Sequence, residues 1–397
     1  MKKNTLIVAL VLVCALLVTG CAKSETTTTD ASAKATKASA PYKIGFIGPM
    51  TGDNANYGIL ISQAAKLAVE EQNAKGGING APVELIIEDS EGSPEKGAAS
   101  FDKLYSSDKI CALVGPVFTG VSFTVGDLCQ ENGVTMITPS GTHKDITAAG
   151  DYVFRTVVSD GLQGEVAGAC FYSELGYKNI GCLYIMNDYS QGLYEGMKAS
   201  FESFGGKVSA VETAQLGDKD FRTQLTRLKA AGVEAIYIPN YTVEMAQQLE
   251  QASQLGIDIP FLSCDGFSNP EIYDLAGSYT DGVIYIGPAK VEESDSYKNF
   301  YDNYTKKFGQ SPDSFANNAY DGANIIMKAI EKAGSSDRKA IRDAVATTKD
   351  YVGVTGVINF ADNGDLVAYQ GVYKVNGTTP EYLGAYTVVD GKLQKVN

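Results

Sequence analysis

The sequence predicts an α/β protein with two doubly wound, Rossmann-like sheets. Short runs rich in β-branched and aromatic residues alternate with amphipathic stretches of helical length. Such alternation is typical of parallel sheets that are covered by helices on both faces. The chain has 397 residues and more strand candidates than one compact sheet would hold, so we expect two domains.

The predicted parallel strands are short and lie between helix candidates. They are the runs at 43–47, 83–88, 110–114, 135–138, 180–186, 207–212, 235–239, 261–264 and 282–286. Near the end of the chain, turns such as Asp362–Asp365 and Asn376–Gly377 separate the strand candidates instead. Antiparallel strands that finish a sheet edge are therefore expected at 353–361, 368–375, 381–389 and 392–396.

The predicted helices have apolar positions three or four residues apart, as at Leu225, Leu228 and Ala231. Glycines such as Gly133 and Gly232 follow the helix candidates and can act as C-terminal caps. The helix candidates are 58–75, 95–106, 123–132, 162–175, 191–204, 221–231, 244–255, 296–308, 315–333 and 338–347.

The N-terminus has the pattern of an export signal. Lys2 and Lys3 precede an apolar run from Leu6 to Val18, which is too short to span a bilayer. The sequence Val-Thr-Gly-Cys that ends at Cys21 resembles the lipobox of bacterial lipoproteins. We expect a lipoprotein signal peptide at 1–20 and lipidation of Cys21. An ordinary secretory signal is the alternative.

A tether is expected at 21–41, because this segment is rich in Ser, Thr, Ala and Lys and cannot bury enough surface to fold. The protein would then work outside the cytoplasm. Its lipid would hold it on the outer face of the cytoplasmic membrane, or on the periplasmic side of an envelope membrane. The net charge of −14 makes nucleic acid and anionic lipid poor partners.

The seven cysteines do not have the spacing of a metal site. Cys14 would leave with the signal peptide, and Cys21 would carry the lipid. We expect no zinc site and no other metal. One disulfide bond is left open, either Cys111–Cys129 or Cys170–Cys182.

Two loops that follow predicted strands are rich in small and hydroxyl-bearing residues, namely 115–120 and 139–142. Ligands gather beyond the carboxyl ends of strands in open α/β sheets. Each loop is expected to open a helix, whose free N–H groups and dipole favour an anion. Two such loops side by side can hold one carboxylate; ordinary N-capping is the alternative for each loop.

Acidic and aromatic side chains also follow predicted strands. Asp265 comes directly after the strand at 261–264 and could meet a ligand ammonium group, or it could cap a helix or lie in a surface turn. Tyr57, Tyr189 and Tyr241 each offer an apolar wall and a hydroxyl group. Packing is the alternative role for any one of these tyrosines.

The chain from Tyr42 onward resembles the type I solute-binding proteins of ABC importers, in their leucine/isoleucine/valine-binding branch. The order and spacing of several short fragments along the whole body carry this resemblance. The matching fragments are GFIGPMTG at 45–52, YG at 57–58, NAKGGING at 73–80, MITP at 136–139, FRT at 154–156, YTVEM at 241–245 and GDL at 364–366.

The resemblance implies two lobes joined by three hinge strands, in a monomer that closes around its ligand. The N-terminal lobe would comprise 42–158 and 289–360, and the C-terminal lobe 159–288 and 361–397. The chain would cross between the lobes near Ser159, Pro288 and Ala361.

The resemblance also implies a binding site. Hydroxyl and backbone N–H groups of the first two loops would hold the carboxylate of an amino acid, and Asp265 would hold its ammonium where relatives carry Glu. Tyr189 would close over the ligand from the other lobe. The carboxylate group comprises Thr119, Ser140, Gly141 and Thr142, and the lining residues are Tyr57, Tyr241 and Phe315.

This chain departs from its relatives in two places. Ser140-Gly141 stands where close relatives often have Ala-Ala, and Ser90 and Phe118 stand where some relatives have a cysteine pair. The backbone donors should be unaffected. These departures affect the specificity of the site for the side chain of the ligand.

The implied function is capture of an amino acid, branched-chain or otherwise apolar, and its delivery to an ABC importer permease and, indirectly, its ATPase subunits. A binding protein for an amide, urea or aromatic acid is one alternative, and a ligand-sensing subunit of a separate membrane receptor is another. No enzyme activity and no cofactor are expected. The chain lacks a Gly-x-Ser-x-Gly motif, His143 is its only histidine and is expected at the surface, and the glycines at 45–52 miss the dinucleotide-binding spacing.

Overall fold

The computed structural model describes residues 40–291 and 294–396. The predicted signal peptide, Cys14, Cys21 and nearly all of the predicted tether lie outside the described residues. The described residues belong to one compact unit, Ser39–Asn397. None of its helices, within the described ranges, combines the length and apolar character that a membrane span requires.

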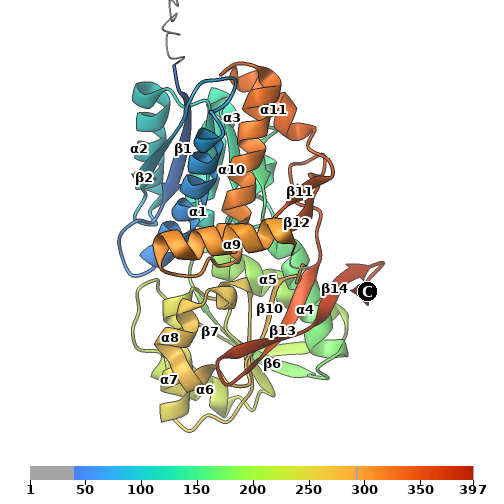
Figure 1. Cartoon of the computed structure of the whole chain (residues 1–397). Coiled ribbons are helices and arrows are strands. Elements are labelled where there is room, and N and C mark those ends of the chain that lie inside the picture. Colours follow the sequence, from blue (N-terminus) through green and yellow to red (C-terminus); the bar gives the residue numbers. More distant parts are fainter. Residues whose placement is uncertain (1–39, 292–293, 397) are drawn as a thin grey trace, which may run out of the picture. The chain divides into compact units, whose positions relative to one another are not determined.

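The first sheet has five parallel strands in the order β2-β1-β3-β4-β5 (Figure 1). The register pairs Ile44 of β1 with Leu85 of β2 on one side and with Ala112 of β3 on the other. The bounds are β1 Tyr42–Gly48, β2 Val83–Asp89, β3 Ala112–Val114, β4 Thr135–Thr138 and β5 Val153–Arg155.

Helices cover both faces of this sheet. On one face Phe46 and Val114 pack in a core with apolar residues from four helices, and on the other face Ile47 and Leu113 pack in a second core. The first group of helices is α1 Ala55–Ala74, α9 Asp295–Phe308, α10 Ser314–Ala333 and α11 Arg338–Ala346, and the second is α2 Pro94–Lys103 and α3 Thr119–Asn132. The alternation of neighbouring β1 residues between two cores confirms the doubly wound arrangement.

The second sheet has eight strands in the order β15-β14-β13-β10-β9-β8-β6-β7. The strands β6 to β10 are parallel, and β13 to β15 extend the edge as antiparallel strands. The bounds are β6 Asn179–Ile185, β7 Lys207–Ala214, β8 Ala235–Tyr237, β9 Phe261–Ser263, β10 Ile284–Pro288, β13 Gln370–Asn376, β14 Thr379–Val389 and β15 Lys392–Val396.

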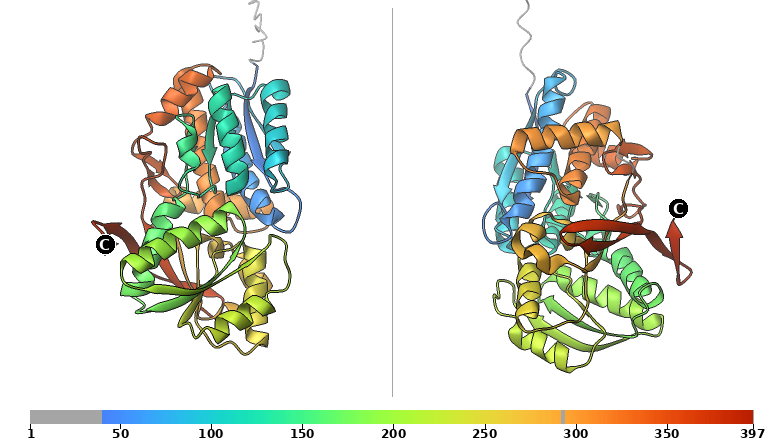
Figure 2. Two further views of the ribbon diagram at one scale, coloured as in Figure 1. Left: turned by 180° about the vertical axis from the view of Figure 1, so that it is seen from behind. Right: turned by 60° about the horizontal axis from the view of Figure 1, so that its bottom comes forward.

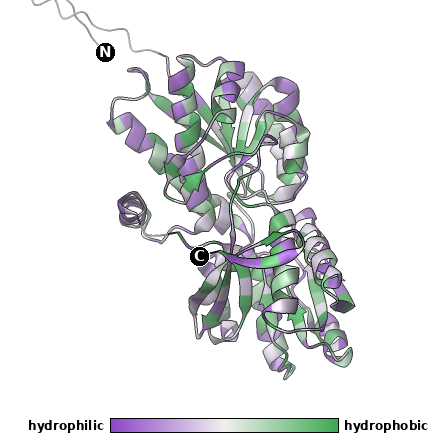
Figure 3. Cartoon of the chain, turned by 90° about the vertical axis from the view of Figure 1, so that its right-hand side faces the viewer, coloured by the Kyte–Doolittle hydropathy of each residue, from purple (hydrophilic) through white to green (hydrophobic). Residues whose placement is uncertain are grey.

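This sheet is also covered on both faces. The paired helices α4 Asp160–Ser173 and α5 Asp188–Ser203 lie on one face, where Cys182 packs with Phe171 and Phe201 (Figure 2). The helices of the other face are α6 Arg222–Ala230, α7 Thr242–Gln254 and α8 Glu271–Ala276. Figure 3 colours the central strands of both sheets mostly as hydrophobic, as expected for strands that are buried on both faces.

The chain passes between the two sheets three times. The connections run from β5 to α4, from β10 to α9, and from the short hairpin β11 Tyr351–Gly353 and β12 Gly356–Ile358 to β13. The predicted fold of two doubly wound lobes with a three-strand hinge is confirmed. The residue-level lobe boundaries stay predictions.

The structure corrects several predicted elements. The loop at 139–142 does not open an α-helix, because the next helical segment is a four-residue 3₁₀ turn, Ile146–Ala149. A hairpin with a turn at 354–355 replaces the single strand expected at 353–361. The strand β5 and the helix α8 were not predicted, and both are too short to show a clear period.

The five cysteines among the described residues are free and buried, so neither disulfide bond left open by the sequence forms. Burial raises the pKa of the Cys111 thiol to about 11 and that of Cys170 to about 12. These thiols therefore pack as small apolar groups. Within residues 40–291 and 294–396, no cluster of three or more His, Cys, Asp or Glu side chains could hold a metal ion.

Candidate ligand-binding site

Six of the predicted site residues line one small cavity between the two sheets. Thr119 is the first residue of α3 and faces this cavity, as predicted from its place after β3. The predicted residues that line the cavity are Thr119, Ser140, Tyr57, Tyr189, Tyr241 and Phe315, and they are joined by Val117 and Phe118.

Aromatic rings from both lobes fill most of this space. The Tyr241 ring stacks on Phe118 at a centroid distance of 4.6 Å and on Tyr189 at 5.0 Å. The Tyr57 ring meets Tyr241 at 5.8 Å and Phe315 at 5.9 Å. The cavity that remains is about 10 Å³, which is about the room that one water molecule needs. An amino acid would therefore require these rings to move apart.

Hydrogen bonds connect the aromatic residues across the lobes. The Tyr57 hydroxyl, from α1 of the first lobe, lies 2.7 Å from Thr242 Oγ1 at the start of α7 in the second. The Tyr189 hydroxyl donates to Asp265 Oδ1 at 2.7 Å. Tyr189 is thus adjacent to the predicted ammonium partner, within the second lobe.

Asp265 begins a short 3₁₀ segment, Asp265–Ser268, directly after β9. Its residue is only 4 % exposed, so the surface-turn alternative is wrong. The backbone N–H of Asp265 donates to Gln163 Oε1 at 2.8 Å. Burial raises the pKa of the Asp265 carboxyl above its ordinary value, because removal from water disfavours the charged form.

The donors at the predicted carboxylate end differ in their availability. The Ser140 hydroxyl donates to the Val117 carbonyl at 2.8 Å, and the Gly141 N–H donates to Thr138 Oγ1 at 2.8 Å. By contrast, the buried hydroxyls of Thr119 and Thr142 make no close hydrogen bond among the described residues, although that of Thr142 lies near the Asp160 carboxylate. The hydroxyls of this end without a close hydrogen bond are therefore those of the two threonines.

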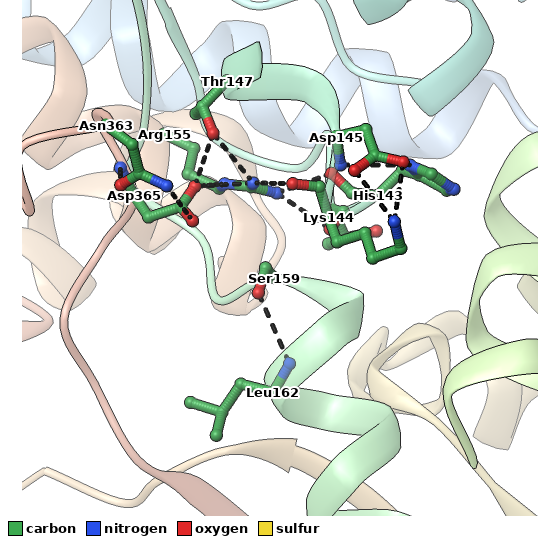
Figure 4. Close-up of polar contacts among 10 residues, drawn as sticks. His143, Lys144, Asp145, Thr147, Arg155, Ser159, Leu162, Asn363 and Asp365 are labelled. Carbon is green, nitrogen blue, oxygen red and sulfur yellow. Dashed lines mark hydrogen bonds and ion pairs between the residues drawn. The ribbon is translucent and has the colours of Figure 1, made fainter. Parts of the chain in front are cut away.

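Arg155 holds the loop at 142–144, of which Figure 4 labels His143 and Lys144. The fully buried Arg155 Nη1 donates to the carbonyls of Thr142 and His143 at 2.9 and 2.8 Å, and Nη2 donates to that of Lys144 at 3.1 Å. Its Nε donates to Asp365 Oδ1 at 2.6 Å. The sequence predicted a helix after this loop. In the structure the carbonyls of residues 142–144 bind Arg155 instead, and the segment stays a loop.

The turn that carries Asp365 depends on a glycine. Gly364 has φ +86°, and its carbonyl accepts a hydrogen bond from the Arg155 N–H at 3.1 Å. A Cβ atom at this position would lie 2.4 Å from the Val153 carbonyl oxygen. Only glycine permits both this conformation and this approach.

Sequence reasoning missed two residues in the first turn of α4. Asp160 is 2 % exposed, and neither carboxylate oxygen makes a close hydrogen bond in the described part of the chain, although the Thr142 hydroxyl is near enough to oppose the rise in pKa that burial causes. Gln163, three residues later, accepts the Asp265 N–H at its Oε1, and hydrogen bonding by its side chain opposes the rise that burial causes in the pKa of the Asp265 carboxyl. From the sequence, Asp160 reads only as an ordinary acidic residue of a first helical turn.

The sequence predicted His143 at the surface, but the structure shows it partly buried. Its ring lies 5.0 Å from that of Phe123, and its Cδ2 is 2.6 Å from the place where a Cβ on Gly192 would stand. Burial lowers its pKa below the ordinary histidine value. His143 therefore marks a point where the first lobe touches α5 of the second.

A larger cavity of about 460 Å³ lies next to the hinge, shares Phe315 with the small cavity and is also lined by Asp265. Apolar side chains such as Val157 and Leu366 form much of its wall, together with the polar Asn318. Space for an apolar ligand group therefore exists directly beyond the aromatic cluster.

The comparisons agree with this architecture. A family model described as a periplasmic binding protein matches residues 41–379. The chain belongs to the periplasmic binding protein family. It is 34% identical over 325 residues to the leucine-, isoleucine-, valine-, threonine- and alanine-binding protein of Pseudomonas aeruginosa, which covers 82% of this chain and 87% of the relative.

Solved structures of this family support the same conclusion. The branched-chain amino acid transporter substrate-binding protein LivJ of Streptococcus pneumoniae, crystallised with isoleucine, is similar with a TM-score of 0.80 and 30% identity, over 90% of this chain and all of that one. The leucine-binding protein LivK of Thermotoga maritima has a TM-score of 0.80 and 28% identity, over 86% and 98% of the two chains. The chain is thus a binding protein and not an enzyme, and its family works outside the cytoplasm.

Proposed function

We propose that this protein binds an apolar α-amino acid, of the branched-chain class, between its lobes and delivers it to the permease of an ABC importer. The observation that carries the proposal is that two kinds of polar group lie beside the aromatic cluster. The buried, unpartnered hydroxyl of Thr119 lines the small cavity, and Tyr189, which lines the same cavity, donates to the buried carboxylate of Asp265. A zwitterion matches both kinds of group.

The apolar surroundings favour an apolar ligand side chain. The rings of Tyr57, Tyr241 and Phe315 offer apolar surface beside these polar groups, and the adjacent hinge cavity is largely apolar. The names of the relatives agree, since the Pseudomonas aeruginosa protein is named for leucine, isoleucine, valine, threonine and alanine. The Streptococcus pneumoniae structure holds isoleucine.

The remaining parts of the proposal concern the cell surface. Cys21 would carry a lipid that holds the protein on the outer face of the cytoplasmic membrane or on the periplasmic side of an envelope membrane. The protein would act as a monomer, and its closed form would be the form that the permease recognises. Thr119, Ser140, Gly141, Thr142, Asp265, Tyr189, Tyr57, Tyr241 and Phe315 remain the proposed ligand-binding residues, with Ser140 and Gly141 supporting the loop.

The test is a thermal-shift and calorimetric screen of residues 39–397 against the common amino acids. Leucine, isoleucine or valine should raise the melting temperature, since a ligand at one hundred times its Kd adds about 2.7 kcal/mol to the free energy of unfolding. Amides, urea and benzoate are included in the same screen. Stabilisation by one of these and by no amino acid would overturn the proposal.

A matched pair of variants locates the site. Asp265→Asn should weaken amino-acid binding by at least tenfold, because it removes the partner of a buried charge. Asp258→Asn lies in the loop before β9 and should leave the affinity unchanged. Equal affinity of Asp265→Asn and the wild type would remove Asp265 from the site.

A further inference from the structure

The site contains a second buried carboxylate, which the proposed ligand contacts leave unexplained. Asp160 is the first residue of α4, and its backbone N–H donates to the carbonyl of Thr142 at 2.7 Å. Asp160 is therefore attached to a residue proposed for the carboxylate end. Both of its carboxylate oxygens are buried and make no close hydrogen bond among the described residues, although the nearby Thr142 hydroxyl opposes the rise that burial causes in the pKa of Asp160.

The same helical turn connects Asp160 to Asp265. Gln163 lies three residues after Asp160, on the same side of α4, and accepts the Asp265 N–H at 2.8 Å. The two aspartates are close enough for the charge of Asp265 to raise the pKa of Asp160, in addition to the larger effect of burial. Two buried carboxylates on different elements thus lie near one another, with Asp160 bordering a cavity beside α5 and Asp265 bordering the hinge cavity.

Within the described residues, no buried cation is left free to balance this pair. Arg155 is the cation that acts on Asp160, but its guanidinium is already bonded to Asp365 and to the carbonyls of the loop at 142–144. The other charged or titratable side chains that border the cavity beside Asp160 are His143, Lys144, Glu165 and Glu195. Lys144 pairs with its neighbour Asp145 at 2.8 Å.

The buried neighbours do not supply a positive charge either, and Lys290, on the hinge side, is exposed to solvent. Tyr189, Tyr237, Tyr241 and Cys264 face the pair, and each of these groups stays neutral because burial raises its pKa. On the hinge side, Lys290 borders the large cavity together with Asp265. Two adjacent like charges cannot both be ionised at low cost in such surroundings.

We propose that Asp160 and Asp265 together hold the ligand ammonium group, and that the ligand-free protein carries one proton on this pair which it releases when the ammonium binds. This inference rests on the proposed function. The proton leaves the carboxyl pair and is taken up by the buffer, so the ammonium keeps its own three protons. Affinity should consequently rise with pH over the range in which the pair holds its proton.

Calorimetric titration of residues 39–397 with isoleucine, in buffers of different ionisation enthalpy between pH 5 and pH 8, counts the protons released. The wild type should release up to one proton, and its affinity should rise by up to about tenfold per pH unit where release is complete. Asp160→Asn should abolish the release and weaken binding at pH 8 by at least tenfold. Unchanged release and affinity in Asp160→Asn would overturn the inference.

Glu165→Gln is the matched control, because Glu165 borders the same cavity one turn further along α4 but is exposed. It should leave both the proton count and the affinity unchanged. If it altered them as Asp160→Asn does, general charge rather than the buried pair would be responsible.

A second measurement needs no ligand. Carboxyl carbon NMR of the ligand-free protein should contain an aspartate signal that titrates well above the ordinary range and that disappears in Asp160→Asn. Absence of such a signal would overturn the inference even if amino acids bind. If the signal is present but no amino acid binds, the carboxyl pair stands and the proposed function fails.

Discussion

Two buried threonines of the candidate site have hydroxyl groups that are expected to lower the stability of the ligand-free protein. The hydroxyls of Thr119 and Thr142 have lost water and make no close hydrogen bond within the described chain. An unsatisfied buried hydroxyl typically costs about 1–3 kcal/mol. Such a cost is expected where a ligand, rather than the protein, is to complete the hydrogen bond.

Thr119→Val should therefore affect stability and binding in opposite directions. The free energy of unfolding, measured by urea denaturation, should stay the same or rise, because valine has a similar shape and no unsatisfied hydroxyl. Affinity for the amino acid should fall by about ten- to one-hundredfold, the equivalent of about 1.5–3 kcal/mol for a hydrogen bond to a charged group.

Thr124→Val provides the control on the same helix, since Thr124 bonds to the Gly120 carbonyl outside the cavity. It should leave affinity unchanged. A Thr119→Val variant that binds as tightly as the wild type would exclude this hydroxyl from ligand contact.

The sequence could predict those site residues that directly follow a strand. Thr119 and Asp265 follow β3 and β9, and the carboxyl ends of parallel strands are where ligands gather. Asp160 and Gln163 could not be found this way, because their role depends on where α4 meets the loop after β9. Gly141 was assigned a free N–H, but its neighbour Thr138 uses that donor.

The three-residue strand β5 connects several parts of the molecule through one of its side chains. Its Arg155 joins the first sheet to the loop at 142–144 and to the turn at 363–365, which belongs to the third connection between the sheets. The carbonyl contacts set the loop that carries Thr142. A short strand thus positions one end of the site and one part of the hinge.

Arg155→Met should lower the free energy of unfolding by about 3–5 kcal/mol, because it leaves Asp365 without its buried partner. Urea denaturation measures this loss. Arg222→Met removes an arginine that is half exposed, and it should change the stability by less than about 1 kcal/mol. A similar small loss in both variants would mean that the Arg155 contacts contribute little.

The β11–β12 hairpin is attached to α10 by a buried carboxylate. Asp321 accepts hydrogen bonds from the N–H groups of Val354 and Thr355, both at 2.9 Å. Burial nevertheless raises the pKa of Asp321 to about 6. The folded protein therefore holds this proton more tightly than the unfolded chain, and the stability contributed by Asp321 falls as the pH rises from about 4 to about 6.

Asp321→Asn removes this dependence. Its cost in unfolding free energy should be larger at pH 4 than at pH 7, by up to about 3 kcal/mol, because only the wild type loses stability over that range. Urea denaturation at both pH values provides the measurement, and the exposed Asp343→Asn is the control. A cost that is equal at the two pH values would contradict the assigned pKa.

The predicted boundaries agree with the structure where an element is long enough to show a clear hydrophobic period. The long helices α1 and α10 lie within a few residues of their predicted ranges. The elements β5 and α8 were missed, since three and six residues contain too few repeats. The segment after β4 was predicted to be helical from its small polar residues, but the Arg155 contacts hold it as a loop.

For the whole molecule, closing of the lobes is expected to depend on how closely they can approach. Gly192 of α5 lies against His143 of the first lobe, where a Cβ would come within 2.6 Å of the imidazole. Gly192→Ala should therefore weaken ligand binding several-fold, although alanine favours the helix by about 1 kcal/mol.

His143→Ala provides a rescue of this variant. Combined with Gly192→Ala, it removes the side chain that the new methyl group meets, so affinity should return toward the wild-type value in calorimetric titration. If the double variant binds as weakly as Gly192→Ala alone, contact between these two residues does not limit closure.

The two-sheet architecture was predictable because alternating strands and helices are a local signal repeated along the chain. The contacts that assemble the site were not, because they join residues far apart in the sequence. The Tyr57 hydroxyl and Thr242 Oγ1 are 2.7 Å apart but separated by 185 positions. From the sequence, only the resemblance to a known family predicted that such distant residues lie close together.

A crystal structure of residues 39–397 with isoleucine tests the central claim most directly. We predict the ligand ammonium within about 2.7–3.2 Å of the Asp265 carboxylate and the ligand carboxylate at the hydroxyls of Thr119 and Thr142. Isoleucine bound elsewhere, or bound between the lobes with its nitrogen directed away from Asp265, would contradict the account.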